Sequence, residues 1–514
     1  MPESLDAVLK ARFYHPGETS WAQVCYRTAK AWGTDSKHTD RIEHMMRSKR
    51  ALPNTPAIAN AGRKNQMGSA CYVLPVNDSL TDGESSIMQT LKDAAAVHKS
   101  GGGTGFSFGR IRAKGTTVSS TGRGAPGAVN VLRLYSDAIH RVTQAGMRPG
   151  ANMGILPVDH PDIIEFISCK GTEGDIHNFN ISVAMTDEFM LKVVSGTLDH
   201  HEQFIWDSIV EGAWRNGEPG VFFIDTTNRL ALHPEWIEAT NPCGEVPLRP
   251  YEACVLGSIN LAAHIGPEVG VMDLDALRET VFTMVEMLDN VIERQDYPIA
   301  EIEREQKRYR KIGVGVMGYA DALCMLGHEY GSPAALRLAE QWMSLIQKYS
   351  YEASERLGEQ RGMPWGWREG MPRRRNLNVQ VIAPTGTISR LAECSFGIEP
   401  HFDVDSEGNY LSFIVGGVYT DHNPYYSNPH FKPASKVTLQ EHITTQAAFQ
   451  KYTDQAVSKT INCPNETTLG EVEDAYIQAW QTGCKGVTIL REGSREETVI
   501  GATEGDCVGG VCPV

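Results

Sequence analysis

The sequence has no long apolar run, no basic excess and no leader-like start, and each absence excludes a class of protein. No apolar stretch approaches the roughly 18 residues that cross a bilayer. The net charge of −15, from 48 basic and 63 acidic residues, argues against a sequence-independent nucleic-acid surface. Met1 to Asp6 lack the basic-then-apolar order of a signal peptide. We therefore expect a soluble, cytoplasmic protein that binds neither membrane nor nucleic acid.

A complete nucleotide-binding signature is also missing, although glycine-rich segments are present. Residues 100–110, SGGGTGFSFGR, match neither the Walker pattern nor a dinucleotide fingerprint. Such a loop can bring backbone N–H groups close to phosphate, or it can simply allow close packing of the backbone. Two more segments, 120–127 and 144–152, combine glycine with arginine, as both anion-binding loops and ordinary surface turns do.

The 11 cysteines are an odd number, and in a reducing compartment most of them should be free thiols. Cys507 and Cys512 lie near the end of a glycine-rich tail, where a disulfide can form and exchange with another. A zinc site remains an alternative, because these two thiols together with Cys71 and Cys254 would make four ligands.

Residues 241–254 carry a carboxamide, a thiol and a carboxylate at alternate positions, followed by a second thiol at Cys254. Pro242 favours an extended conformation at Asn241, and the later prolines exclude a continuous helix. Alternate residues of an extended segment face the same side, so Asn241, Cys243 and Glu245 could converge on one small ligand. The alternative is a surface loop that happens to contain two cysteines.

Strand-like and helix-like segments alternate along the rest of the chain. Residues 221–224, 379–383 and 487–490 are predicted strands, and apolar residues from Leu277 to Ile292 recur at helical spacing. This alternation predicts an α/β fold with largely parallel strands and functional loops at their carboxyl ends. We expect a helical N-terminal region over 1–50, one catalytic domain over 51–495 and a flexible, redox-active tail over 496–514.

Taken in order, these motifs resemble the catalytic chain of class II ribonucleotide reductase, the adenosylcobalamin-dependent form. The resemblance covers roughly residues 50 to 514. Its motifs are Pro53-Asn54-Thr55-Pro56, Cys71 followed by Asp78-Ser79-Leu80, the glycine loop at 100–105, Arg148 to Gly154, Asn241 to Cys254, Ala383 to Ser389, and the cysteine tail. It implies a ten-stranded α/β barrel with a finger loop at its centre, and adenosylcobalamin as cofactor.

The resemblance also implies a division of chemical roles. Cys243 would be the thiyl radical that abstracts the 3′ hydrogen of a ribonucleoside di- or triphosphate. Glu245 would take the 3′-hydroxyl proton, and Asn241 would hold the ribose by hydrogen bonding. The reaction would yield a 2′-deoxyribonucleotide.

Four further cysteines would carry electrons. Cys71 and Cys254 would supply two electrons and end as a disulfide, with Cys71 protonating the departing 2′-hydroxyl. Cys507 and Cys512 would reduce that disulfide and be reset by a thioredoxin- or glutaredoxin-like partner.

The resemblance places substrate and effector at separate sites. The substrate-binding positions would be Thr55, the Ala70 backbone, and the turn Pro384, Thr385, Gly386, Thr387, Ile388 and Ser389. A deoxynucleotide or ATP effector would bind at a homodimer interface near Asp78, Ser79 and Leu80, with segments 120–127 and 144–152 relaying its identity. The lead before Pro53 is short, so we expect no ATP-cone regulatory domain.

Two alternatives lie within the same family. A class I chain would receive its radical from a metallosubunit through adjacent tyrosines near the C-terminus, but the adjacent pair here, Tyr425 and Tyr426, lies well upstream of the tail. A regulatory relative that has lost catalysis should lack some of the five family cysteines, Asn241 or Glu245, and all are present. The remaining cysteines (25, 169, 324, 394, 463 and 484) are expected to be inert thiols.

Overall fold

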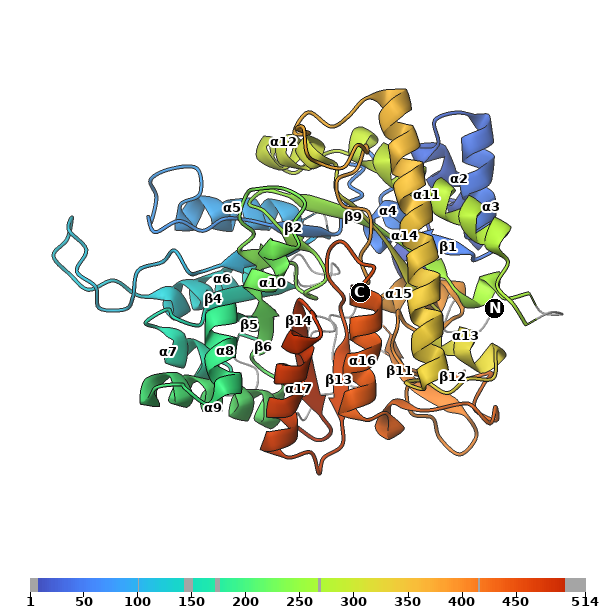
Figure 1. Ribbon diagram of the computed structural model, residues 1–514. Coiled ribbons are helices and arrows are strands. Elements are labelled where there is room, and N and C mark those ends of the chain that lie inside the picture. The colour runs from blue at the N-terminus through green and yellow to red at the C-terminus, as the bar shows by residue number, and fades with distance from the viewer. Residues whose placement is uncertain are drawn as a thin grey trace. The chain divides into compact units, whose positions relative to one another are not determined.

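The computed structural model describes residues 8–99, 101–142, 151–171, 176–266, 270–414 and 417–494 (Figure 1). The chain divides into two units. The first unit contains Met1–Ala70, Ala253–Val457 and Pro513–Val514, and the second contains Cys71–Glu252 and Ser458–Cys512. The tail with Cys507 and Cys512, and most of the predicted effector loop at 144–152, lie outside the described residues.

The first unit begins with helices, as the pattern before residue 50 predicts. They are the π-helix η1 (Leu9–Phe13), α2 (Trp21–Trp32) and α3 (Ser36–Arg47). Ser20 and Gln23 form a reciprocal capping box at the start of α2, which satisfies backbone N–H groups that a helix end leaves unpaired.

Three strands form the sheet of the first unit. The fully buried strand β9 (Ala253–Asn260) pairs antiparallel with β1 (Ala51–Pro53) and parallel with β10 (Ile312–Met317). Steric contact explains why β10 contains glycine, since a Cβ on Gly315 would lie 2.2 Å from the Val381 carbonyl oxygen. The closely packed residues 379–383 form isolated bridges among the described residues and not the predicted strand. The Val379 N–H donates instead to Asp454 Oδ2, at 2.9 Å.

Helices and short elements complete the first unit. The long helices α11 (Leu274–Arg294) and α14 (Pro333–Arg361) lie side by side (Figure 1), and α11 buries the predicted apolar face. The other elements are α4 (Thr55–Ala59), η2 (Ala262–His264), α12 (Ala300–Tyr309), α13 (Tyr319–Met325), α15 (Gly386–Ala392), the hairpin of β11 (Asn409–Ile414) and β12 (Gly417–His422), η3 (Ala434–Lys436) and α16 (Leu439–Gln450).

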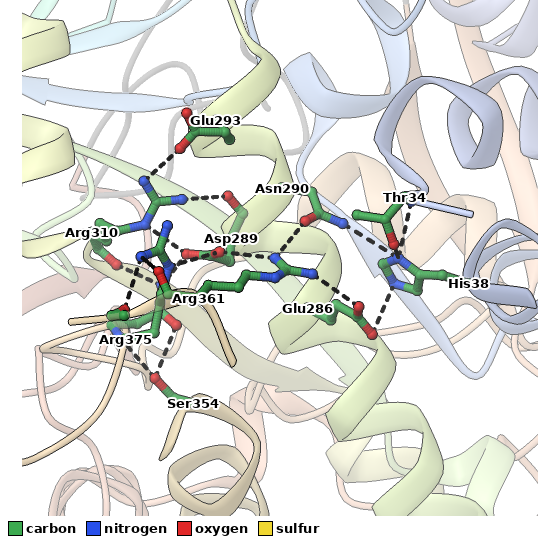
Figure 2. A network of polar contacts seen from close by, with 12 residues as sticks. Thr34, His38, Glu286, Asp289, Asn290, Glu293, Arg310, Ser354, Arg361 and Arg375 are labelled. Carbon is green, nitrogen blue, oxygen red and sulfur yellow. Dashed lines mark hydrogen bonds and ion pairs between the residues drawn. The ribbon is translucent and has the colours of Figure 1, made fainter. Parts of the chain in front are cut away.

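A buried carboxylate ties α11 to its neighbours (Figure 2). Asp289 accepts hydrogen bonds from Arg310 Nε at 2.8 Å, Arg361 Nη1 at 3.1 Å and Arg375 Nε at 3.3 Å. The amide of Asn376 donates to the same carboxylate at 3.0 Å. Burial works to raise the pKa of Asp289, but Arg310 and Arg375 outweigh it and hold that pKa below its usual range.

The second unit is built on a seven-stranded sheet in the order β2-β3-β4-β5-β6-β14-β13. Neighbours are parallel except for the antiparallel pair of β6 and β14. The strands are β2 (Cys71–Val73), β3 (Gly103–Ser107), β4 (Asn152–Pro157), β5 (Phe179–Met185), β6 (Gly220–Phe223), β13 (Thr460–Cys463) and β14 (Gly486–Arg491). The predicted strands at 221–224 and 487–490 are therefore present, the first of them over 220–223, and the sheet is largely parallel as expected.

Helices connect consecutive strands of this sheet, which is the α/β arrangement that the sequence predicts. They are α5 (Ile87–His98), α6 (Ala128–Val142), α7 (Ile163–Ser168), α8 (Asp187–Ser195), α9 (His200–Asn216) and α17 (Leu469–Gln481), while α10 (Ile224–Arg229) follows β6. Among the described residues, no helix is both long enough and apolar enough to cross a membrane.

Candidate active site

The segment that carries Cys243 is the tip of a small hairpin in the second unit. Strands β7 (Ala239–Thr240) and β8 (Pro247–Leu248) pair antiparallel, and residues 241–246 connect them. The Gly244 N–H donates to the Asn241 carbonyl oxygen at 3.0 Å, and Gly244 has φ +82°. The predicted extended conformation is therefore wrong. Proline in second place and glycine in fourth place of a four-residue segment favour a tight turn, and this pattern accounts for the turn from Asn241 to Gly244.

The turn nevertheless brings the carboxamide of Asn241 to the first predicted redox thiol. Asn241 Nδ2 donates to Cys71 Sγ at 3.1 Å, although the two residues are 170 positions apart in sequence. The other end of the carboxamide, Oδ1, accepts the Val246 N–H at 2.9 Å. Both Asn241 and Cys71 are buried, so this amide is fixed at two atoms against the sulfur.

Glu245 is a buried carboxyl on the same turn. Burial raises its pKa to about 7, and a hydrogen bond with Asn241 offsets only part of that rise. Its Oε2 has no hydrogen-bond partner among the described residues. A carboxyl with a free oxygen and a pKa near neutrality can accept a proton from a hydroxyl group that binds beside it.

Cys243 is more accessible than its neighbours on the turn. Its side chain is half-buried and packs against Ala151, while Asn241 and Glu245 are almost fully buried. The adjacent Gly244 borders open space, since a Cβ built there would meet none of the described atoms within 4 Å. The Cys243 side chain is thus in contact with Ala151 and partly exposed, next to the open space at Gly244.

The glycine-rich segment 100–110 packs closely against this turn through Gly103 and Gly105. A Cβ on Gly105 would lie 1.8 Å from the Thr240 carbonyl oxygen, and one on Gly103 would lie 2.9 Å from Pro242 Cγ. Of the two alternatives for this segment, close packing of the backbone therefore accounts for Gly103 and Gly105.

Asn180 contacts the turn from the neighbouring strand β5. Its Nδ2 donates to the Pro242 carbonyl oxygen at 2.8 Å. The sequence predicts no role for Asn180, and it predicts Ala151 only as part of the effector loop 144–152, not as a neighbour of Cys243. Polar and apolar residues alternate from Asn178 to Val183, which is typical of a strand but does not indicate a partner for Asn180.

Cys254 lies in the first unit on β9 and is fully buried. Its Sγ faces the carbonyl oxygens of Val255 at 3.7 Å and Lys311 at 3.9 Å. Gln455 Nε2 donates to the same sulfur at 3.8 Å. The Cys254 carbonyl accepts the Ala70 N–H at 3.3 Å, so that backbone donor is already in use.

The predicted phosphate turn, residues 384–389, also belongs to the first unit. Thr385 has φ +61°, an unusual conformation for a threonine, and its Oγ1 lies 2.7 Å from Ser389 Oγ and accepts the Gly397 N–H at 2.7 Å. A Cβ on Gly386 would meet none of the described atoms within 4 Å. Helix α15 begins here, so the backbone N–H groups of its first turn lack intrahelical partners.

Thr55, another predicted substrate-binding residue of the first unit, begins α4. Its hydroxyl oxygen is buried and has no hydrogen-bond partner among the described residues. A buried hydroxyl without a partner is uncommon because it forfeits its hydration, and a bound polar ligand would supply the missing contact.

The predicted effector residues lie in the second unit, shortly before α5. Arg112 donates to Asp78 from Nε at 2.5 Å and from its backbone N–H at 3.3 Å. Ser79 Oγ accepts the Asp82 N–H at 3.0 Å, and Leu80 is exposed. In segment 120–127, the backbone carbonyl oxygen of Arg123 accepts a hydrogen bond from the Val118 N–H at 2.8 Å.

The other described cysteines match the expectation of inert thiols. Cys25, Cys169, Cys324, Cys463 and Cys484 are buried, and Cys394 is half-buried. Burial raises the pKa of Cys324 and Cys484 to about 12, which disfavours the reactive thiolate. Within the described parts of the chain, no three His, Cys, Asp or Glu side chains are arranged to hold a metal ion.

Comparisons with known proteins agree on one family. The family model described as ribonucleotide reductase, barrel domain, matches residues 69–204, 199–374 and 418–490. The vitamin B12-dependent ribonucleoside-diphosphate reductase of Thermoplasma acidophilum is 39% identical, over 91% of this chain and 67% of its own length. The reductase of the same name from Mycobacterium tuberculosis (strain CDC 1551) is 37% identical, over 91% of this chain and 74% of its own.

A solved structure shares the fold. The Actinobacillus ureae class Id ribonucleotide reductase alpha subunit superposes with a TM-score of 0.80, over 96% of this chain and 97% of that one, at 22% identity. Together with the barrel-domain match, this confirms the predicted α/β barrel class.

Proposed function

The chain belongs to the ribonucleotide reductase family, in its vitamin B12-dependent branch, and we propose that it reduces ribonucleoside diphosphates to 2′-deoxyribonucleotides. One observation in particular supports active chemistry in this chain. The turn that carries Cys243 holds a carboxamide against the Cys71 sulfur and a buried carboxyl with a pKa of about 7. The names of the two similar reductases support the choice of a diphosphate substrate, whereas the sequence leaves diphosphate and triphosphate open.

We propose that Cys243 carries the radical that abstracts the 3′ hydrogen of the ribose. Its partly exposed side chain and the open space at Gly244 support this role. Glu245 takes the 3′-hydroxyl proton through its unpartnered oxygen. The Asn241 carboxamide holds the 3′ side of the ribose, and in the absence of substrate it is engaged by Cys71 and Val246.

Cys71 and Cys254 supply the reducing equivalents in this proposal. Two thiols become one disulfide and release two electrons and two protons, while the 2′ C–O bond breaks and the hydroxyl leaves as water. Cys71 is suited to deliver the first proton, because Asn241 fixes its sulfur. Cys507 and Cys512 then reduce the disulfide by thiol exchange, and a thioredoxin- or glutaredoxin-like protein resets them.

The residues present fit adenosylcobalamin as the radical source. A bulky cofactor needs a thiol that it can approach, and Cys243 is the half-buried residue at the open end of the turn. When bound, the cofactor supplies the homolytic chemistry that starts the radical reaction. The protein holds the Cys243 backbone, keeps Glu245 dry and limits water around the reacting atoms.

Substrate and effector binding complete the proposal. Thr55 and the turn at 384–389 bind the substrate, with the free N–H groups of the turn facing the phosphates. An effector deoxynucleotide or ATP binds near Asp78, displacing Arg112 from the carboxylate, at the interface of a homodimer.

An activity assay with adenosylcobalamin and no other protein subunit tests this function. We expect turnover of a ribonucleoside diphosphate with dithiothreitol as reductant. A requirement for a separate metal-containing subunit would overturn the radical source and place the chain in class I.

The radical role of Cys243 can be tested with the single substitution Cys243→Ser. Turnover should be lost while binding of a deoxynucleotide effector is retained, because the effector residues lie elsewhere on the second unit. Residual multiple turnover in the variant would remove Cys243 from the reaction.

A further inference from the structure

The side chain of Asn180 makes a direct contact with the backbone that carries the reactive thiol. Asn180 lies on β5, and its Nδ2 donates to the Pro242 carbonyl oxygen at 2.8 Å. Asn180 is only 4% exposed. The contact is therefore a short hydrogen bond shielded from water, and such bonds are stronger than those at the surface.

The Pro242 carbonyl directly precedes Cys243, so a hydrogen bond to it restrains the turn next to the reactive thiol. It belongs to the peptide bond between Pro242 and Cys243, so fixing it fixes the plane from which the Cys243 side chain departs. Proline has no N–H group, which leaves its carbonyl as the hydrogen-bonding group of that residue.

Two more residues enclose the same point. Gly103 leaves room for the Pro242 ring, since a Cβ there would lie 2.9 Å from Cγ. Ala151 packs against the Cys243 side chain. The turn is thus held by a carbonyl contact from Asn180, a ring contact beside Gly103 and a side-chain contact from Ala151.

The placement of Asn180 in its strand argues that the contact has a purpose. All seven residues of β5 are buried, and Asn180 shares its face of the strand with the smaller Ser182 and Ala184. Burying an amide is unfavourable unless its hydrogen bonds are restored. The buried Asn180 amide therefore needs partners inside the protein, and the Pro242 carbonyl oxygen is one of them.

We propose that Asn180 is a positioning residue for the reaction, holding the Pro242 carbonyl so that Cys243 points at the substrate's 3′ carbon. The inference rests on the proposed radical role of Cys243 and adds a residue that acts through the backbone of the turn. Hydrogen abstraction depends steeply on the separation of the reacting atoms, and a misplacement of about 1 Å can cost 10²-fold in rate.

The experiment compares Asn180→Ala and Asn180→Asp with Ser182→Ala in the full chain. Asp has the volume of Asn but presents an oxygen to the Pro242 carbonyl in place of the donor. Ser182 lies two residues along β5 on the same face and is buried, so its substitution controls for a change in the strand itself.

Three measurements are made on each variant. Steady-state kinetics with adenosylcobalamin should show kcat reduced by about 10- to 100-fold for both Asn180 variants, with KM within about twofold. In the cofactor-free protein, hydrogen exchange of residues 240–246 should rise. The alkylation rate of Cys243 by iodoacetamide, located by mass spectrometry, should change by about tenfold while the buried Cys484 is unaffected.

The outcomes separate the inference from the proposed function. Exchange, alkylation and kcat equal to those of Ser182→Ala in both Asn180 variants would overturn the positioning role. If Asn180→Ala increases hydrogen exchange along all of β5, the result from Asn180→Asp is used instead. In that variant, faster exchange confined to residues 240–246 supports the proposal, and exchange at the wild-type rate overturns it. Failure of the proposed function appears instead as turnover retained by Cys243→Ser, whatever the Asn180 variants do.

Discussion

A carboxyl group removed from water holds its proton more tightly, and Glu245 shows what this means for a catalytic base. Its pKa of about 7 is set mainly by burial, with Asn241 opposing the shift. An ordinary carboxylate is a weak base, whereas one that titrates near the working pH combines a useful basicity with an adequate population of the charged form. Burial and the hydrogen bond with Asn241 therefore shift the pKa of Glu245 in opposite directions.

Glu245→Gln tests this assignment through a pH profile. The wild-type kcat should fall as the pH drops through about 7, because protonation of Glu245 removes the base. The variant should lose about 10²- to 10⁴-fold in kcat and lose that acid limb as well. Rates are measured between pH 5.5 and 8.5 with dithiothreitol as reductant. An acid limb that persists unchanged in the variant would assign it to another group.

Residue types could be predicted from the sequence better than their contacts. Cys71, Asn241 and Glu245 stand out because each has a chemistry that the motif order predicts, and the structure brings the three together. Asn180 and Ala151 could not be predicted in this way. An asparagine and an alanine are common in any fold, and their contacts with the turn arise only when β4 and β5 are placed beside it.

At the scale of elements, strands and helices with strong periodicity were predictable, and short irregular segments were not. The apolar face of α11 and the strand β14 follow from repeated local signals. The bridge-forming segment 379–383 depends on non-local contacts, such as the Asp454 carboxylate that accepts the Val379 N–H, whereas the turn at 241–244 follows from a local signal, Pro242 and Gly244. Local propensity cannot anticipate a partner 75 residues away.

Gly105→Ala tests the fit between β3 and the reactive hairpin. The added Cβ would lie 1.8 Å from the Thr240 carbonyl, so the hairpin must move. We expect turnover to fall by at least tenfold and unfolding to become easier by about 1–3 kcal/mol, as in other overpacked sites. Gly470→Ala is the control, because a Cβ there meets nothing within 4 Å on helix α17 and should be neutral or slightly stabilising. Equal behaviour of the two variants would contradict the packing argument.

Asp289→Ala tests the buried network of the first unit. The substitution leaves Arg310, Arg361 and Arg375 facing one another without their shared carboxylate (Figure 2). Removing one partner from a buried ionic group costs about 3–5 kcal/mol. Lys451→Ala, which breaks the exposed pair with Glu340, should shift the urea midpoint far less, because solvent screens that pair. Urea unfolding measures both, and similar midpoints would show that the network contributes little.

At the scale of the whole molecule, two sets of buried groups make stability depend on pH in opposite directions. Burial lowers the pKa of His98, His264 and His401 to about 4, so between pH 4 and 6.5 the unfolded chain binds more protons at these sites and stability rises with pH. Burial raises the pKa of Glu245 and Asp321 to about 7, so over much the same range the folded chain binds more protons there and stability falls with rising pH. The two sets partly cancel, and we expect a shallow profile.

The double variant Glu245→Gln with Asp321→Asn should expose the histidine contribution. Each carboxyl removed takes away an opposing slope of up to about 1.4 kcal/mol per pH unit. The variant should therefore gain stability relative to the wild type as pH rises from 4.5 to 7, with the gain levelling off above the pKa of about 7. Urea midpoints across this range measure it, with the exposed Glu359→Gln as the control. Parallel curves for the double variant and the wild type would mean that these carboxyls do not titrate differently in the folded and unfolded chain, and the assignment of Glu245 as a base tuned by burial would fall with them.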